Sequence, residues 1–207
     1  MGRVQSVNVG RESTGDWTGP RGRTGIDKRP VVSRVTVTVH GIAGDCVVRG
    51  DDDQAVYAFA REDVGWWERE LGRVFAPGQF GENLSTVDID LTGALIGERW
   101  AVGSAVLEVS GPRTPCVVLE GFWGVPGLIK RFTEHGICGA YLRVHTPGEI
   151  GPGDAIEVVH RPAHGLTVGE SFRAITTEPA LLPKLLTAPE LMLKARVKAE
   201  HRTAVTN

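Results

Sequence analysis

The chain has little net charge and no long hydrophobic run. Its 207 residues carry a formal net charge of -2 at pH 7, whereas a domain that binds nucleic acid is expected to be basic. No apolar stretch approaches the roughly 20 residues that span a bilayer. The first ten residues also lack the apolar core of a signal peptide. We therefore expect a cytoplasmic protein that binds neither nucleic acid nor a membrane.

Cysteines are few and widely spaced. Cys46, Cys116 and Cys138 form no CxxC pair, and an odd number of thiols suits neither a disulfide framework nor a zinc site. The histidines show no HxH or HExxH spacing, and a proline inside HRPAH (160–164) argues against a helix that would align its two histidines. The GxGxxG, Walker and GxSxG motifs are missing as well. Each thiol must therefore be judged alone.

Glycine and proline are abundant, with 27 and 12 residues. Such a frequency of turn-forming residues favours many short strands over a helical bundle. Val35, Val37 and Val39 alternate with polar residues, as in a half-buried strand. We predict a mixed α/β, β-rich fold with a barrel-like core and inserted helices, not a doubly wound sheet. The expected strands cover residues 3–9, 33–39, 86–91, 99–109, 116–120, 139–145 and 154–160.

Three segments show helical patterns. Apolar residues follow helical spacing from Val56 to Leu71, and Gly72 is a natural end. Residues 125–136 predict a short helix, and residues 176–203 predict two more with apolar faces. These faces could pack on the core or against another subunit, so a homodimer is one expected arrangement. We expect a β-barrel domain over residues 1–170 and a short helical extension over residues 171–207.

Cys116 stands in the segment GPRTPC (111–116), directly after Pro115 and three residues after Arg113. The thiolate is the form of cysteine that attacks substrates and ligates metals, and a neighbouring cation favours it. Arg113 could therefore activate this sulfur. A buried and inert cysteine explains the same pattern, and the local sequence alone favours that second interpretation.

Polar and basic residues offer a second group of candidates. In FGENL (80–84), a flexible Gly81 precedes Glu82 and Asn83, which suits a polar ligand but also a plain turn. Arginine binds phosphate and carboxylate groups in a bidentate manner. If the scattered arginines converge, they would form an anion pocket, which the sequence alone leaves open. The basic candidates are Arg49, Arg113, Lys130, Arg131 and Arg143.

Four segments occur together in the order of a known family. They are FGENL, IGERWAVGSAVLEV (96–109), PRTPC (112–116) and a G-x-GD-x-I turn at residues 151–156. With these segments the chain resembles the MOSC domain, the module named after the C-terminal part of molybdenum cofactor sulfurases. It is most similar to the bacterial stand-alone members of that family. The resemblance implies a β-rich, barrel-like core with inserted helices.

The resemblance also implies a function. Cys116 would be the catalytic residue and the molybdenum ligand of a molybdopterin cofactor, and the small-molecule substrate would be an N-hydroxylated compound. The implied cofactor-binding residues are Gly81, Glu82, Asn83, Arg49, Arg113 and Arg143. Because no Cys-rich ferredoxin-like segment is present, electrons would come from a separate electron-transfer protein or reductase.

One departure from the family pattern keeps alternatives open. Stand-alone members usually carry a His-Gly-Gly-type segment before the AVYAF segment (55–59), and Arg49 stands where that histidine is expected. Two other functions therefore remain. Cys116 could hold a persulfide as a sulfur carrier, or the chain could be a non-catalytic cofactor-binding module.

Overall fold

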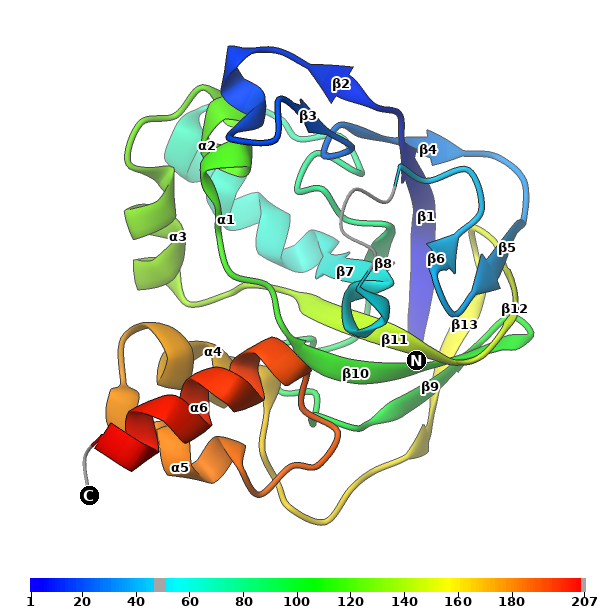
Figure 1. Ribbon diagram of the computed structural model, residues 1–207. Helices are drawn as coiled ribbons and strands as arrows, with labels where there is room; N and C mark the ends of the chain where they lie inside the picture. The colour runs from blue at the N-terminus through cyan, green and yellow to red at the C-terminus, as the bar shows by residue number, and fades with distance from the viewer. Residues whose placement is uncertain (47–50, 206–207) are drawn as a thin grey trace.

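The computed structural model describes residues 1–46 and 51–205, and its core is a closed β-barrel (Figure 1). In this described part, the barrel strands follow the order β13-β9-β10-β11-β7-β8-β1, and β1 closes the ring by pairing with β13. Neighbouring strands are antiparallel except for the parallel pair β7–β8. The predicted β-rich barrel is thus confirmed. Its strands are β1 (Gly2–Gly10), β7 (Val56–Ala60), β8 (Leu84–Val87), β9 (Arg99–Val102), β10 (Ala105–Pro112), β11 (Ala140–Thr146) and β13 (Ala155–His160).

Smaller strands surround the barrel. β4 (Lys28–Val31) extends the sheet beside β1. A two-stranded ribbon and a three-stranded sheet complete the β-structure of the described residues. The ribbon pairs β2 (Ser13–Thr14) with β3 (Arg23–Thr24), and the sheet contains β5 (Val35–Thr38), β6 (Gly41–Ile42) and β12 (Gly148–Ile150). Two short 3-10 turns, η1 (Asp16–Thr18) and η2 (Asp52–Gln54), lie in the loops.

Strand β7 corrects the predicted helix that began at Val56. Residues Val56–Ala60 are all buried in the strand, and helix α1 (Arg61–Leu71) starts only after them. A short continuous apolar run is compatible with a strand buried on both faces, and its periodicity cannot distinguish it from a helix. Only the second part of the expected helix, which ends at Gly72 in a left-handed conformation, is confirmed.

Two helices follow strand β10, namely α2 (Val117–Trp123) and α3 (Leu128–His135). Helix α3 confirms the prediction for residues 125–136. Helix α2 contradicts the strand predicted at 116–120, because Leu119 and Trp123, four residues apart, turn one helical face into the core. There Trp123 packs edge-on against Trp67 of α1, with ring centroids 5.5 Å apart and 74° between the ring planes. This tertiary contact outweighs the strand propensity of the valines.

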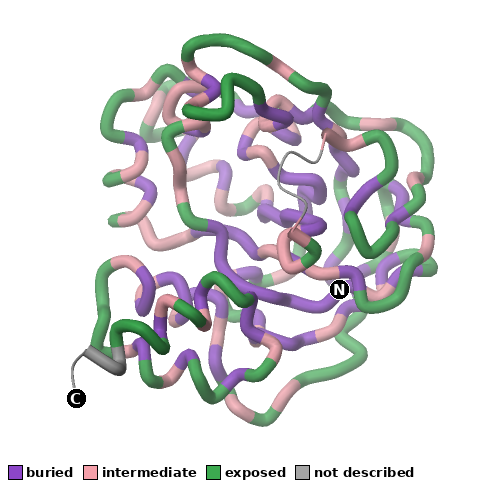
Figure 2. Tube along the Cα trace, viewed as in Figure 1, coloured by how far each residue is buried: buried purple, intermediate pink, exposed green. Residues whose placement is uncertain are grey.

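The C-terminal segment is helical, as predicted, and packs beside the barrel (Figures 1 and 2). Its elements are α4 (Val168–Thr176), η3 (Pro179–Leu181), α5 (Leu182–Leu185) and α6 (Leu193–Val205). The predicted domain boundary at residue 170 falls inside α4, whose apolar face is buried. Gly111 of β10 lets Met192 approach closely, since a Cβ atom there would lie only 2.3 Å from the methionine methyl group. None of the helices in the described residues is long and apolar enough to cross a membrane.

Candidate functional site

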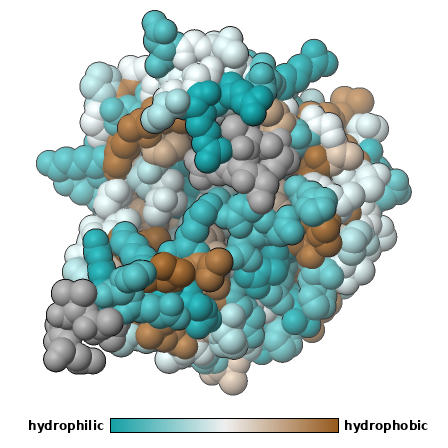
Figure 3. Space-filling view, viewed as in Figure 1, coloured by the Kyte–Doolittle hydropathy of each residue, from teal (hydrophilic) through white to brown (hydrophobic). Residues whose placement is uncertain are grey.

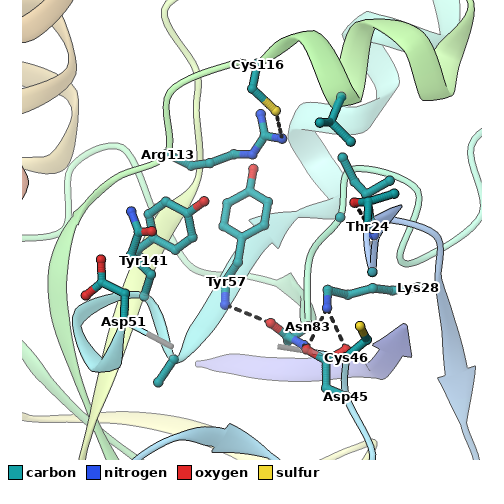
Figure 4. A pocket seen from close by; sticks show the side chains of 16 residues that line it. Thr24, Lys28, Asp45, Cys46, Asp51, Tyr57, Asn83, Arg113, Cys116 and Tyr141 are labelled. Carbon is teal, nitrogen blue, oxygen red and sulfur yellow. Dashed lines mark hydrogen bonds and ion pairs between the residues drawn. The ribbon is translucent and has the colours of Figure 1, made fainter. Parts of the chain in front are cut away.

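A solvent-open pocket, here called the inner pocket, lies between one side of the barrel and the loops of the N-terminal half (Figure 4). Its empty volume, including the open mouth, is about 800 Å³. The lining combines basic, acidic, aromatic and thiol side chains. The residues are Thr24, Gly25, Ile26, Lys28, Asp45, Cys46, Asp51, Gln54, Ala55, Tyr57, Gly81, Asn83, Arg113, Cys116, Val118 and Tyr141. Four predicted site residues therefore meet in one place, namely Gly81, Asn83, Arg113 and Cys116.

Cys116 and Arg113 form one wall of the inner pocket (Figure 4). Cys116 is the extended residue that precedes α2, and its carbonyl accepts the N–H groups of the first helical turn. The Sγ atom lies 3.9 Å from Nη2 of Arg113, which donates to it. This contact confirms the proximity that the three-residue spacing suggested.

The Arg113 guanidinium is buried but incompletely paired. The residue is only 4% exposed, and its Nη1 atom has no hydrogen-bond partner among the described residues. The guanidinium carbon lies 5.5 Å from the ring centre of Tyr57 and 5.8 Å from that of Phe132. An unpaired buried donor costs free energy, so this cation is poised to bind an anion that enters the pocket.

The surroundings keep Arg113 charged. Burial lowers its pKa, but the phenol of Tyr57 and the thiol of Cys116 act in the opposite direction, and the pKa of Arg113 ends above its ordinary value. Burial also raises the pKa of Tyr57 well above its usual range, and Arg113 opposes that shift. Tyr57 therefore stays protonated and donates its hydroxyl hydrogen to the carbonyl of Cys138. The wall consists of one fixed cation beside neutral aromatic rings.

A buried ion pair forms the opposite side of the inner pocket (Figure 4). Lys28 Nζ lies 2.6 Å from both carboxylate oxygens of Asp45, and both side chains are less than 10% exposed. Asp45 also accepts the N–H of Gly10 at 2.6 Å and the amide of Asn83 at 2.9 Å. Asn83 in turn accepts the N–H of Tyr57 at 3.1 Å. This network fixes the FGENL segment against strand β7.

Glu82 stabilises the FGENL segment by hydrogen bonds and is not among the residues that line the inner pocket. Its buried carboxylate accepts the N–H groups of Gly78 at 2.6 Å and Phe80 at 2.9 Å, and the Ser85 hydroxyl at 2.7 Å. Burial raises the pKa of Glu82, although these hydrogen bonds oppose the shift. Gly81 has φ 78°, and a Cβ atom there would lie 3.0 Å from Ile26. Gly81, Glu82 and Asn83 therefore have distinct structural roles.

The sequence left open whether several basic residues converge on one anion pocket. Of the basic candidates that the structure describes, only Arg113 lines the inner pocket. Arg143 projects from β11 toward Asp53 and Glu108, with N–O distances of 2.7 Å to each, and is not among the residues that line the inner pocket. Arg49 lies outside the described residues. The expected cofactor-binding roles of both arginines stay predictions.

Several lining residues were missed by sequence reasoning. Lys28 opens the short strand β4, and Asp45 and Cys46 lie in a loop; neither segment has a recognisable sequence pattern. The sequence pattern placed Tyr57 in a helix, whereas it lies in strand β7. Tyr141 lies on β11 and packs against Tyr57, with ring centroids 5.4 Å apart. The strand predicted at residues 139–145 contains Tyr141, but nothing in the local sequence indicated which tyrosines face a pocket.

A second hollow adjoins the inner pocket, and Cys116 lines both. This outer hollow shares Thr24, Asp51, Cys116 and Val118 with the inner pocket. Its remaining wall comes from the N-terminal loops, η2, the start of α2 and the start of α6. These residues are Thr18, Pro20, Arg21, Arg23, Asp52, Asp53, Val117, Leu193 and Lys194. The Cys116 side chain therefore stands at the junction of two spaces.

Comparisons with known proteins match this architecture. The profile of the MOSC domain matches residues 45–157. YflK of Bacillus subtilis is 34% identical over 169 residues, which are 80% of this chain and 76% of that protein. A Gibberella moniliformis protein named Reductase is 29% identical over 168 residues, but the match covers only 28% of its length.

A solved structure shows the same fold over the whole length. The crystal structure of YiiM from Geobacillus stearothermophilus superposes with a TM-score of 0.84 at 29% identity, and the match covers 98% of this chain and 99% of that chain. The barrel, the ordered motifs and the profile match agree with one another. The chain belongs to the MOSC domain family.

Proposed function

We propose that this protein is a molybdenum-cofactor-binding oxidoreductase that reduces N-hydroxylated compounds, with Cys116 as the metal ligand. One observation carries the proposal: the Cys116 sulfur and the incompletely paired Arg113 guanidinium line the same pocket. The MOSC family is associated with molybdenum cofactor binding. The fungal relative named Reductase supports redox chemistry for this chain.

The residues present fit the cofactor chemically. A cysteine thiolate is a soft ligand that suits a metal already bound by the dithiolene sulfurs of the pterin. The phosphate of the pterin is an anion, and the buried Nη1 of Arg113 is a donor without a partner in the described part of the chain. A charge-assisted hydrogen bond between these two groups is roughly twice as strong as a neutral one.

The bound cofactor would supply a metal that exchanges two electrons. Reduction of an N-hydroxylated amine or amidine consumes two electrons and two protons, breaks the N–O bond and releases water. Arg113 holds the anionic part of the cofactor, and Cys116 presents its sulfur from the rigid segment after Pro115. Asn83 and the Lys28–Asp45 pair keep the opposite wall in place. We propose that a separate electron-transfer protein or reductase delivers the electrons.

The test is metal and pterin analysis of protein purified from a host that makes the cofactor. Wild type should contain molybdenum and pterin in similar amounts, and Cys116→Ala should lose most of both. Cys46→Ala is the matched control, because Cys46 also lines the pocket but burial raises the pKa of its thiol. Wild type without molybdenum and pterin would contradict the proposal, as would equal retention in both variants.

A sulfur carrier is the second candidate. The observation that favours it is the position of Cys116 between the inner pocket and the outer hollow, where a partner could reach a persulfide. Mass spectrometry would then find one additional sulfur atom on Cys116 in protein that contains no pterin. Unmodified Cys116 in freshly isolated protein would count against this function.

A further inference from the structure

The charged side chains that line the inner pocket are balanced in number. Among the described residues they are two cations, Lys28 and Arg113, and two carboxylates, Asp45 and Asp51. Lys28 and Asp45 neutralise each other in their buried ion pair. The Arg113 cation therefore shares the pocket with the Asp51 carboxylate, and Figure 4 shows both on the same side of it. An anion that enters is attracted by one of these charges and repelled by the other.

Lys194 neutralises Asp51 from outside the inner pocket. Its Nζ atom lies 2.5 Å from Asp51 Oδ2 and donates to Gln54 Oε1 at 3.3 Å. Lys194 belongs to the C-terminal segment and is not among the residues that line the inner pocket. When its charge is included, three cations stand against two carboxylates, and the described surroundings of the pocket carry a net charge of +1.

The position of Lys194 is unfavourable for the helix that carries it. Lys194 is the second residue of α6, and the N-terminal end of a helix is the positive end of its dipole. Its side chain is 59% exposed, and an ion pair in contact with water contributes little to stability. Neither helix formation nor stability therefore accounts for a cation here, whereas the charge of Asp51 does.

The start of α6 is held in place without the Lys194 side chain. The N–H of Leu193 donates to Asp53 Oδ2 at 2.9 Å, and the N–H of Met192 donates to the Ser110 carbonyl at 2.7 Å. In Figure 3, the surface between η2 and the start of α6 is mostly hydrophilic. Removal of the Lys194 amine should therefore leave the helix in place and change the charge beside the pocket.

We propose that Lys194 is a specificity-determining residue that makes the inner pocket selective for anions by neutralising Asp51. The C-terminal segment thereby supplies a charge to a site that the barrel and the N-terminal loops otherwise build. The inference rests on the proposed function in one respect, since the natural anion would be the pterin phosphate beside Arg113. The electrostatic argument applies to any small anion, so inorganic phosphate is a suitable probe.

Calorimetric titration of cofactor-free protein with phosphate at low ionic strength tests the inference. Lys194→Met leaves the Asp51 carboxylate without its cation and should raise the Kd for phosphate about 3- to 10-fold. Asp51→Asn removes the repulsion and should lower this Kd by a similar factor, while asparagine can still accept the N–H of Asp53. The double variant restores the charge balance and should bind phosphate within about twofold of wild type. Added sodium chloride should weaken both single effects.

Lys198→Met is the matched control. Lys198 lies on the same helix, but its amine donates to the Ile175 carbonyl and it lines neither the inner pocket nor the outer hollow. This variant loses the same charge and should keep the Kd within about twofold of wild type. Thermal unfolding checks that all variants are folded.

Three results would overturn the inference. A double variant that binds phosphate as weakly as Lys194→Met would show that the lysine acts by holding α6 and not by its charge. Equal Kd values in wild type and both single variants would show that the pair does not affect the pocket. Absence of phosphate binding by wild type would show that the pocket is not an anion site.

Metal analysis separates this inference from the proposed function. Wild type without molybdenum and pterin, with phosphate affinities that follow the charges of residues 51 and 194, would refute the proposed function alone. Wild type with molybdenum and pterin, with equal phosphate affinities in all variants, would refute the role of Lys194 alone.

Discussion

Replacing Arg113 by methionine should make the protein more stable and less able to bind anions. The guanidinium is 4% exposed, and no carboxylate of residues 1–46 or 51–205 lies within ion-pair distance of it. A buried charge without a counter-ion costs several kcal/mol, and Tyr57, whose ionised form would raise the pKa of Arg113, supplies no counter-ion because it stays protonated. Contacts with the rings of Tyr57 and Phe132 offset about 0.5–2 kcal/mol of that cost.

The expected gain follows from these magnitudes. Methionine fills a similar volume with an apolar chain, so the free energy of unfolding of Arg113→Met should rise by about 1–3 kcal/mol. For a chain of this length, that gain corresponds to an increase in Tm of about 2–12 °C. The same change removes the donor for an anion. Phosphate at ten times its Kd should stabilise wild type by about 1.4 kcal/mol and should leave the variant unaffected.

Urea unfolding of cofactor-free protein at low ionic strength, with and without inorganic phosphate, measures both effects. Arg143→Met is the control of opposite sign, because it removes a partner of the buried Glu108. It should lose about 1–3 kcal/mol, since Glu108 keeps its contact with Arg99. An Arg113→Met variant that is less stable than wild type and still responds to phosphate would refute the reasoning.

Three further substitutions, at Asp63, Glu82 and Lys28, test how charged side chains contribute to the stability of the fold. Burial raises the pKa of Asp63 to about 6, so its contribution to stability is present below the unfolded-state pKa and is lost as the pH rises through 6. Because the side chain is partly exposed and solvent screens its charge, wild type should lose about 1–2 kcal/mol relative to Asp63→Asn between pH 4 and 7.5 in urea unfolding, and parallel pH profiles would contradict this. Glu82→Gln should lower the free energy of unfolding by about 1–3 kcal/mol, because the amide nitrogen that takes the place of Oε2 cannot accept the N–H of Phe80; unchanged stability would disprove that role. Lys28→Met should cost about 3 kcal/mol by leaving Asp45 buried without its cation, and a loss below about 1 kcal/mol would show that the pair is dispensable.

The sequence was most informative where structure depends on neighbours along the chain. Alternating valines and frequent turn residues indicated a barrel-like β-rich core. The spacing of Arg113 and Cys116 indicated their contact, which is a hydrogen bond across three residues. The order of four motifs indicated the family, and the profile match supports it. Composition, residue spacing and the order of the motifs were sufficient for these features.

The features that the sequence did not predict depend on contacts between residues far apart in the chain. Strand β7 is buried on both faces, and its apolar run was read as part of a helix. Arg143 is paired with Asp53, which lies 90 residues earlier in the chain. Asn83 meets Asp45 across 38 residues, and no local pattern marks Asp45 as part of a pocket wall. Such convergence depends on how the barrel closes, and periodicity carries no information about it.

The central claim is that Cys116 ligates molybdenum in the inner pocket. X-ray absorption at the molybdenum edge measures it most directly, because the number of sulfur ligands can be counted in the protein as purified. The Cys116→Ser variant, if it retains metal, should show one molybdenum–sulfur contact fewer than wild type and Cys46→Ser. The same number of sulfur ligands in all three proteins would contradict the account.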